Sequence, residues 1–312
     1  MKTLKTTTGW LAQGEHVMTY ATPDVRQDHE PTLYMYAALD WAGLTRWEPT
    51  TAAVYDAAGK RIDGFQVVKG KHSHITVTTD KYRPIEHLSH LLPVMKTVSD
   101  TLDAPCTGVL VNDDGKSILA RFTTDQLYMD GDPSPYAKET WVRLRHDARG
   151  ALTVFERAQR LFCTNQIPVL SSVANADLMV RHTGDIDVKV NGLVERLKSR
   201  EDDWVLWEKE MATLQSTTVR PPQFEEFTRL FIPEPLPPVS PVRAQNAQNE
   251  LQSLWRGYTA DLGQTAYAGY QAIVEFEDKV RASRGGASRM QRAINPNPNK
   301  SRGLRMLMEV AR

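Results

Sequence analysis

Residues 136–147 read Tyr-Ala-Lys-Glu-Thr-Trp-Val-Arg-Leu-Arg-His-Asp, and this stretch decides the fold that the sequence predicts. Side chains along a β-strand alternate between two faces, so Val142 and Leu144 point to the same side. The opposite face carries an indole and two guanidinium groups, from Trp141, Arg143 and Arg145. One apolar and one polar face are typical of an antiparallel sheet that is solvated on one side. Arginines beside an aromatic ring on such a face can also hold phosphates and stack bases.

Further strands are predicted on both sides of this stretch. Alternating or β-branched runs predict strands at residues 46–56, 64–68, 75–79, 107–111, 117–122 and 151–155. Between the third and fourth of these runs, apolar residues at helical spacing follow Pro84 and predict a helix. Gly115-Lys-Ser117 is not the end of a phosphate-binding P-loop, because it joins two strands rather than opening a helix. The order predicts an α+β protein, with an antiparallel, hairpin-rich sheet and helices packed on one side.

The pattern becomes helical after Gly184. Apolar residues recur at heptad spacing through Val190, Leu193, Leu197, Trp204, Trp207, Met211 and Leu214. This seam predicts a helix that packs on the sheet, with a subunit contact as the alternative. The proline-rich segment 233–241 predicts an extended connector. We therefore expect a sheet-rich body at residues 1–232 and a helical C-terminal region with a basic tail at residues 242–312.

Composition limits the classes of protein that this chain can represent. It has 312 residues, a formal net charge of zero and a hydrophobic fraction of 41%, as expected of a soluble globular protein. Cys106 and Cys163 are the only cysteines, which excludes a disulfide framework and fits a reducing compartment. Without a signal-like or membrane-spanning apolar run, a cytoplasmic location and no membrane partner are expected. Any anion site must come from local clustering of charge.

Basic residues cluster near the C-terminus. Glu309 is the one acidic residue among them, and the basic ones are Lys279, Arg281, Arg284, Arg289, Arg292, Lys300, Arg302, Arg305 and Arg312. A basic, turn-rich tail suits phosphate backbones. The alternative is a tail that folds against the acidic body of its own or a neighbouring subunit.

Two arginine-centred motifs flank the loop before the helical half, and they are Arg160-Leu-Phe-Cys-Thr-Asn165 and Arg181-His-Thr-Gly184. Together they favour a phosphate clamp. An enzyme that uses Arg160, Cys163, Asn165 and His182 is the alternative. On an extended strand, Cys163 and Asn165 share a face while Arg160 lies on the other, which argues against a cysteine nucleophile oriented by asparagine. Cys163 is therefore predicted to be a small buried residue.

The sequence predicts no metal site. His72 and His74 on one strand face, with His87 and His90 one turn apart on a helix, could supply nitrogen ligands. Two lysines beside the first pair oppose a cation, and no cysteine or carboxylate has helpful spacing. Surface or packing roles are expected for these histidines. We expect neither a metal nor another cofactor.

Several motifs across most of the chain carry a family resemblance, among them Leu39-Asp-Trp41, Lys81-Tyr-Arg-Pro-Ile85, both arginine-centred motifs and Gly263-Gln-Thr-Ala-Tyr267-Ala-Gly-Tyr270. In the order of these motifs along the sequence, the chain resembles DUF932, a family of phage- and plasmid-borne proteins of unknown function. It departs from the family after Asp147, where Ala-Arg-Gly-Ala replaces a small, serine-bearing turn. The resemblance implies a mobile-element protein in an infected or plasmid-bearing bacterial host. The β-β-β-α order of residues 46–102 is also similar to Rad52-type and phage single-strand annealing proteins.

These observations lead to three hypotheses about function. The first is a mobile-element DNA-metabolism protein that binds single-stranded DNA without covalent chemistry, as an annealing homo-oligomer. The residues expected to contact the nucleic acid are Trp141, Arg143, Arg145, Arg160, Asn165, Arg181, His182, Arg284, Arg289 and Arg292. The second is a structural or interaction protein that binds a host or phage protein. The third is the enzyme described above.

Overall fold

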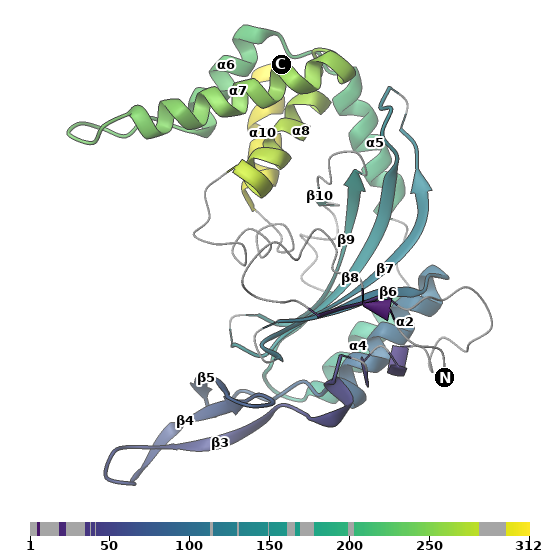
Figure 1. Ribbon diagram of the computed structural model, residues 1–312, viewed down its shortest axis with the longest axis vertical. Coiled ribbons are helices and arrows are strands. Elements are labelled where there is room, and N and C mark those ends of the chain that lie inside the picture. The colour runs from purple at the N-terminus through teal and green to yellow at the C-terminus, as the bar shows by residue number, and fades with distance from the viewer. Residues whose placement is uncertain are drawn as a thin grey trace. The chain divides into compact units, whose positions relative to one another are not determined.

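The chain is an α+β protein, as predicted, in a computed structural model. The structure describes residues 5–6, 19–22, 35–37, 39–40, 42–112, 115–129, 131–148, 150–160, 166–168, 178–198, 203–280 and 298–312. Its elements are two sheets and a set of helices that includes a C-terminal helical region (Figure 1). No helix in these ranges combines the length and the apolar character needed to cross a bilayer.

The larger sheet is built mainly from sequential hairpins. Its strands follow the order β1-β2-β6-β7-β8-β9-β10, and β11 also pairs with β9. Their bounds are β1 Lys5–Thr6, β2 Thr19–Thr22, β6 Cys106–Asn112, β7 Ser117–Leu127, β8 Tyr136–Arg145, β9 Leu152–Arg160, β10 Gln166–Pro168 and β11 Met179–Val180. The pairing of β6 with β7 is antiparallel and places Val109 opposite Ala120. This hairpin-rich arrangement confirms the prediction from residues 136–147.

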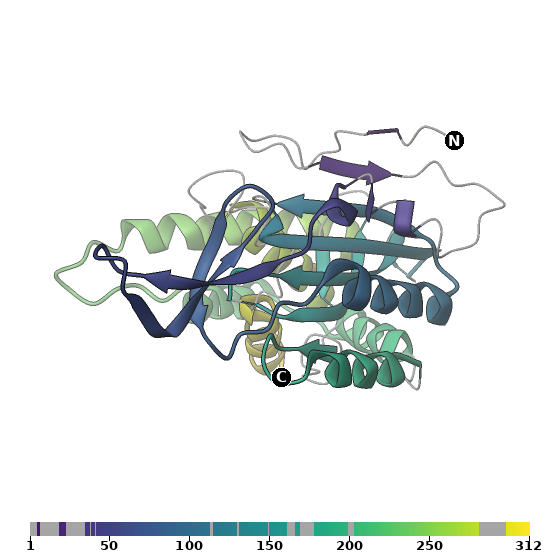
Figure 2. The ribbon, with the colours of Figure 1, turned by 90° about the horizontal axis from the view of Figure 1, so that it is seen from below.

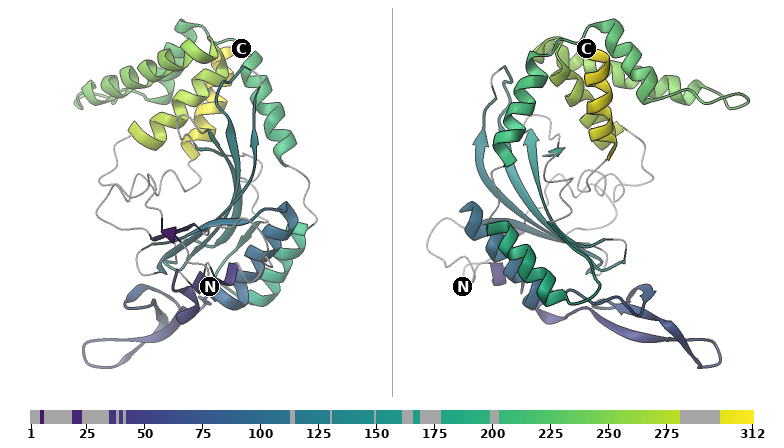
Figure 3. Two further views of the ribbon diagram at one scale, coloured as in Figure 1. Left: turned by 45° about the vertical axis from the view of Figure 1, so that its right-hand side comes forward. Right: turned by 180° about the vertical axis from the view of Figure 1, so that it is seen from behind.

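The chain divides into two compact units, and the divisions fall inside β7, β8 and β9. The first unit comprises residues 1–125, 139–156 and 174–201. Here helices α2 (Leu92–Leu102) and α4 (Ile186–Lys198) lie side by side against one face of the strands (Figures 2 and 3). Val98 of α2 and Leu193 of α4 share one apolar core with Val142 of β8. Burial of these helix stripes on the sheet is the main stabilising contribution to this unit.

A three-stranded sheet completes the first unit, with β3 Thr50–Tyr55, β4 Arg61–Lys69 and β5 His74–Thr79. Its strands are consecutive and antiparallel. The amide of Gln66 donates hydrogen bonds to the carbonyls of Thr79 and Tyr82, at 3.0 and 2.8 Å. Val68, Ile75 and Tyr82 form a small buried cluster on this sheet. The sheet therefore holds Tyr82 in place where the chain leaves β5.

The second unit comprises residues 126–138, 157–173 and 202–312 and is mostly helical. Its helices are α5 Asp203–Ser216, α6 Pro221–Phe231, α7 Val242–Leu262, α8 Ala266–Glu275, the π-helix η6 Phe276–Val280 and α10 Pro298–Ala311. Helix α8 contacts α5, α7 and α10, and it is buried on nearly every side. Aromatic residues fill this core, and the ring of Phe224 stacks on that of Trp255 with centroids 4.5 Å apart.

The heptad prediction was wrong in its extent. The pattern continues through residues 199–202, but α4 and α5 are separate helices that belong to different units. Val190 and Leu197 are buried in the core of the first unit, whereas Met211 and Leu214 are buried in that of the second. An apolar repeat reports that each helix has a buried stripe, but not that the two stripes meet the same partner.

The proline-rich segment lies inside the second unit rather than between domains. Helices α6 and α7, on either side of it, pack on each other, and Gln248 donates a hydrogen bond to the carbonyl of Ile232 at 2.7 Å. The C-terminal residues likewise form a packed helix. Lys300 of α10 is buried, and its amine lies 2.8 Å from Oδ2 of Asp278. Residues 281–297 of the predicted basic tail lie outside the described ranges.

Candidate functional site

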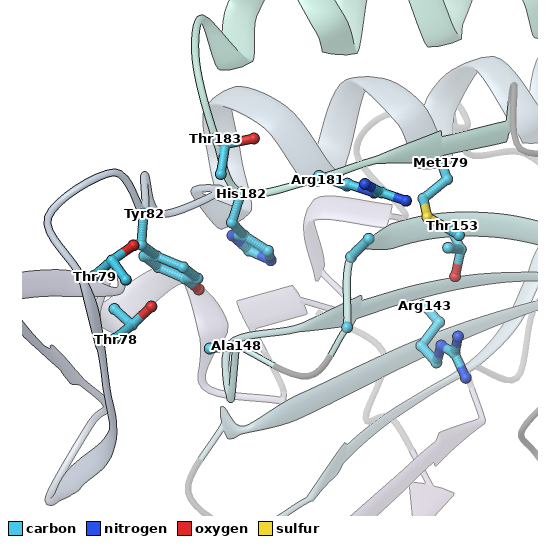
Figure 4. A pocket seen from close by; sticks show the side chains of 12 residues that line it. Thr78, Thr79, Tyr82, Arg143, Ala148, Thr153, Met179, Arg181, His182 and Thr183 are labelled. Carbon is cyan, nitrogen blue, oxygen red and sulfur yellow. The ribbon is translucent and has the colours of Figure 1, made fainter.

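A cavity of about 440 Å³ lies in the first unit and brings together segments that are far apart in sequence (Figure 4). Its lining residues are Thr78, Thr79, Tyr82, Arg143, Ala148, Gly150, Ala151, Thr153, Met179, Arg181, His182 and Thr183. In Figure 4, Tyr82 and His182 lie at one end, and the side chains of Arg143 and Arg181 lie toward the other. A concave space with a few polar groups is where a small ligand or part of a larger one binds.

The lining is cationic and rich in hydroxyl groups. Among the described residues, it carries the guanidinium groups of Arg143 and Arg181, the four hydroxyls of its threonines, and no carboxylate. Arg181 is exposed, whereas Arg143 is half-buried and its guanidinium lies 5.5 Å from the centre of the Phe155 ring. Burial and the charge of the neighbouring Arg145 lower the pKa of Arg143 to about 10. Arg143 therefore remains a cation at neutral pH and favours an anion beside it.

The β8–β9 connection shapes one wall of the cavity. Ala148 has φ 58°, a left-handed conformation that is uncommon for alanine. A Cβ on Gly150 would lie 2.5 Å from Cδ of Arg145, so only glycine fits against that side chain. Arg145 in turn donates a hydrogen bond from Nε to Asp147 at 3.2 Å. Arg145 thus supports the connection and is not among the residues that line the cavity.

Three buried histidines pack on one another at the cavity, and they are His182 of the lining, His146 and His87. The rings of His87 and His146 have centroids 5.4 Å apart, and those of His146 and His182 are 5.7 Å apart. Burial is the first cause that lowers the pKa of each of these histidines, most strongly that of His146. All three imidazoles are therefore neutral at pH 7.

Hydrogen-bond partners define the tautomer of each neutral ring. Nδ1 of His87 faces the carbonyl oxygens of Leu44 and Trp47 at 3.1 and 3.2 Å, so it carries the proton. Nε2 of His87 is then an acceptor, and Nε2 of His146, 3.3 Å away, must donate to it. This leaves Nδ1 of His146 without a proton, and it has no hydrogen-bond partner in the described part of the protein.

The tautomer of His182 follows from the same reasoning. Its Nδ1 lies 3.1 Å from the carbonyl oxygen of Arg83 and therefore carries the proton. The imidazole stacks on Tyr82 with centroids 4.6 Å apart and planes 8° from parallel. Nε2 is therefore unprotonated, no described group donates a hydrogen bond to it, and the carbonyl of Arg145 is a second backbone acceptor beside the ring. The hydroxyl of Thr153, a buried residue of the cavity wall, also has no partner among the described residues.

A family model described as Domain of unknown function (DUF932) matches residues 74–299. This is well over half of the chain. The chain belongs to the DUF932 family. The matched range contains every residue that lines the cavity. No curated protein and no solved structure matches the chain, and the similarity to Rad52-type annealing proteins is not supported.

In this DUF932 protein, the cavity unites three of the predicted nucleic-acid contacts: Arg143, Arg181 and His182. Trp141 is different, because it is only 2% exposed. Its indole Nε1 donates a hydrogen bond to Glu139 at 2.8 Å, and its ring stacks on Phe155. The expectation that Trp141 stacks bases from a solvated strand face is therefore corrected.

Arg160 also has a structural partner. It belongs to the second unit, and its Nε and a terminal nitrogen donate to Asp132 at 2.9 and 2.7 Å. Arg160 is 4% exposed and satisfies a buried carboxylate. The remaining residues predicted in this cluster or in the tail lie outside the described residues: Cys163, Asn165, Arg284, Arg289 and Arg292.

The sequence reasoning missed Tyr82, Thr153 and the histidine cluster. His87 and His90 were considered with His72 and His74 as possible metal ligands, but His87 faces His146 instead, and His90 pairs with Asp187 at 3.0 Å. The described residues contain no group of three or more ligands arranged to hold a metal. His146 follows directly on the arginine-bearing strand, and this adjacency is the one signal that pointed to the cluster.

Proposed function

We propose that this protein binds single-stranded DNA, with a backbone phosphate held in the cavity between Arg143 and Arg181. The observation that supports it is the convergence of two guanidinium groups and four threonine hydroxyls on one cavity, whose described lining residues include no carboxylate. Guanidinium groups and hydroxyls are the side-chain donors that most often contact nucleic-acid phosphates. Part of the cationic end is desolvated, and a phosphate gains more from an arginine there than at an open surface.

The proposal keeps the ligand class predicted from the sequence but changes how the strand is held. Trp141 is buried and Arg160 is paired, so neither offers a stacking or phosphate-binding surface. Single-strand binding then depends on the cavity, because a flexible single strand can place one nucleotide in it, whereas the stacked bases of a duplex oppose this. A preference for single strands over duplex is expected for that reason.

Fluorescence anisotropy with a labelled single-stranded oligonucleotide tests this proposal. Arg181→Gln should lower the affinity about tenfold and reduce the slope of log affinity against log salt by about one, because one phosphate contact is lost. Arg181 is exposed, so the substitution leaves the core intact. The matched control is Arg256→Gln, which removes an exposed arginine from α7 and should bind as the wild type does.

Two results would contradict the proposal. One is the absence of salt-sensitive binding by the wild type at low ionic strength. The other is equal affinity of Arg181→Gln, Arg256→Gln and the wild type. Either result would turn attention to a protein partner, for which a pull-down from a host extract is the next measurement.

A further inference from the structure

The end of the cavity opposite the arginines has a distinct chemical character. His182 lies there, and only 4% of it is exposed. Its Nδ1 proton is used by the carbonyl of Arg83, and its ring face is covered by Tyr82. Nε2 carries a lone pair that accepts no hydrogen bond from any described residue, and the backbone carbonyl of Arg145 is the second acceptor beside the ring. A buried acceptor in this state favours a ligand that brings a donor.

We infer that the ligand must carry a neutral N–H or O–H donor on the same nucleotide whose phosphate lies at the arginines, and that this donor bonds to Nε2 of His182. This inference rests on the proposed function. A phosphodiester and its deoxyribose ring offer only acceptors, so a phosphate contact alone leaves Nε2 unsatisfied. The donors that single-stranded DNA can present are the N–H groups of a base edge and the hydroxyl at the end of a strand.

The other polar groups at this end fit the same class of ligand. The hydroxyls of Thr78, Thr79 and Thr183 line the cavity near Tyr82 and His182 (Figure 4). A hydroxyl can donate or accept, so these side chains adapt to either source of the donor, whereas Nε2 of His182 can only accept. His182 is therefore the residue that requires a hydrogen-bond donor on the ligand. A cavity of about 440 Å³ is large enough for a small ligand or one residue of a larger one.

Four oligonucleotides of equal length distinguish the two sources. All four carry a 5′-phosphate; the first has all bases and a free 3′-hydroxyl, the second has all bases and a 3′-phosphate, and the third has tetrahydrofuran abasic residues and a free 3′-hydroxyl. The fourth has tetrahydrofuran abasic residues and phosphates at both ends, so it lacks both donors. The wild type should bind the fourth at least about fivefold more weakly than the first, because one hydrogen bond and its partner are lost. Full affinity for the second assigns the donor to the base, and full affinity for the third assigns it to the strand end.

Two variants separate this hydrogen bond from the loss of base stacking. His182→Asn places an amide N–H near the position of Nδ1, which preserves the bond to Arg83 but removes the acceptor at Nε2. The ratio of its affinities for the first and the fourth strand should be much smaller than that of the wild type. In His182→Gln, the amide oxygen reaches the position of Nε2, so this variant should recover part of the wild type's preference for the first strand over the fourth. Circular dichroism of both variants checks that they fold.

The inference is overturned if the wild type binds all four strands equally, or if His182→Asn retains the full difference between the first and the fourth. These results leave the phosphate proposal standing, because binding itself persists and depends on Arg181. The failure of every strand to bind the wild type would instead remove the proposed function, and the donor requirement with it.

Discussion

Nε2 of His87 lies 3.3 Å from Nε2 of His146, so two buried neutral imidazoles share one proton between facing nitrogens. The carbonyls of Leu44 and Trp47 fix the direction of this hydrogen bond, because they require the proton of His87 on Nδ1. The bond joins the start of the helix after β5 to the end of β8. The hydrogen bonds therefore fix the tautomers of His87 and His146, and the His146 ring in turn packs against that of His182 in the cavity wall.

The stability of the first unit should fall as the pH drops below about 6.5. Burial lowers the pKa of His87, His146 and His182 in the folded state, so the unfolded chain binds protons that the folded chain does not. The free energy of unfolding is highest above the pKa that histidine has in the unfolded chain. Below that pKa it falls by about 1.4 kcal/mol per pH unit for each proton that only the unfolded chain binds. Urea denaturation at pH 7.5, 6.5 and 5.5 measures this loss.

His146→Gln tests the origin of that pH dependence. The amide of glutamine can still donate to His87, but it does not titrate, so the slope should decrease by about one proton. His74→Gln, in an exposed position of β5, is the matched control and should keep the wild-type slope. An identical slope in all three proteins would show that the buried cluster does not control the acid sensitivity.

Asp132→Asn should destabilise the second unit by about 3–5 kcal/mol. Burial alone would raise the pKa of Asp132, but hydrogen bonds from Arg160 and Tyr136 outweigh it and lower the pKa. The hydroxyls of Tyr136 and Tyr267 also donate to this carboxylate, at 2.7 and 2.9 Å. Asparagine would leave the buried guanidinium without its counter-ion. The measurement is the midpoint of chemical denaturation.

The control for this ion pair is Glu225→Gln on α6. Glu225 and Arg229 are 3.6 Å apart and both are mostly exposed, so their pair should contribute no more than about 0.5 kcal/mol. A loss of comparable size in Asp132→Asn would mean that the buried network adds little to stability.

Gly269→Ala and Gly303→Ala should each destabilise the packing of α8 on α10 by about 1–3 kcal/mol. A Cβ at position 269 would lie 2.7 Å from Leu307, and one at position 303 would lie 2.9 Å from Ile273. Gly257→Ala on α7 is the control, because beyond the helix's own backbone no atom lies within 4 Å of the Cβ that alanine would add. That change should stabilise the helix by about 0.5–1 kcal/mol. Thermal melting of the three variants should show opposite shifts, and a common direction would contradict the packing argument.

Glu48→Gln should increase amide hydrogen exchange at the start of the helix that follows β5. The two carboxylate oxygens of Glu48 accept hydrogen bonds from the backbone amides of His87 and Leu88, at 2.6 and 3.0 Å. Glutamine has one acceptor oxygen and no charge, so it satisfies fewer of these amides and loses the favourable interaction with the helix dipole. The expected cost is about 1 kcal/mol. Unchanged exchange at both positions would show that Glu48 does not cap this helix.

Local patterns predicted much of the fold, because each strand and helix has a buried stripe that is visible in the sequence. The predicted strands at residues 75–79 and 117–122 lie within β5 and β7, and the helical region predicted from residue 242 begins with α7. The unit boundaries could not be predicted in this way. They depend on which buried stripe meets which partner, and neither the heptad residues nor the prolines at 233–241 contain that information.

The candidate site was predicted only in part, for a related reason. Arginine and histidine at positions 143, 181 and 182 stand out by residue type, but an alternating pattern does not show which face of a strand is covered. Trp141 illustrates this, because Glu139 and Phe155 bury the ring that was expected to face water. The tautomer of His182 depends on a carbonyl almost a hundred positions away in the chain, which no local pattern reports.

Each unit is assembled from three separate stretches of the chain, because the polypeptide crosses from one unit to the other within β7, β8 and β9 and again after residues 173 and 201. A single genetic exchange anywhere between residues 125 and 202 would give each unit some of its stretches from one parent and some from another. Neither unit can be acquired or lost alone by one crossover. A single exchange that keeps each unit wholly from one parent must therefore transfer both units together.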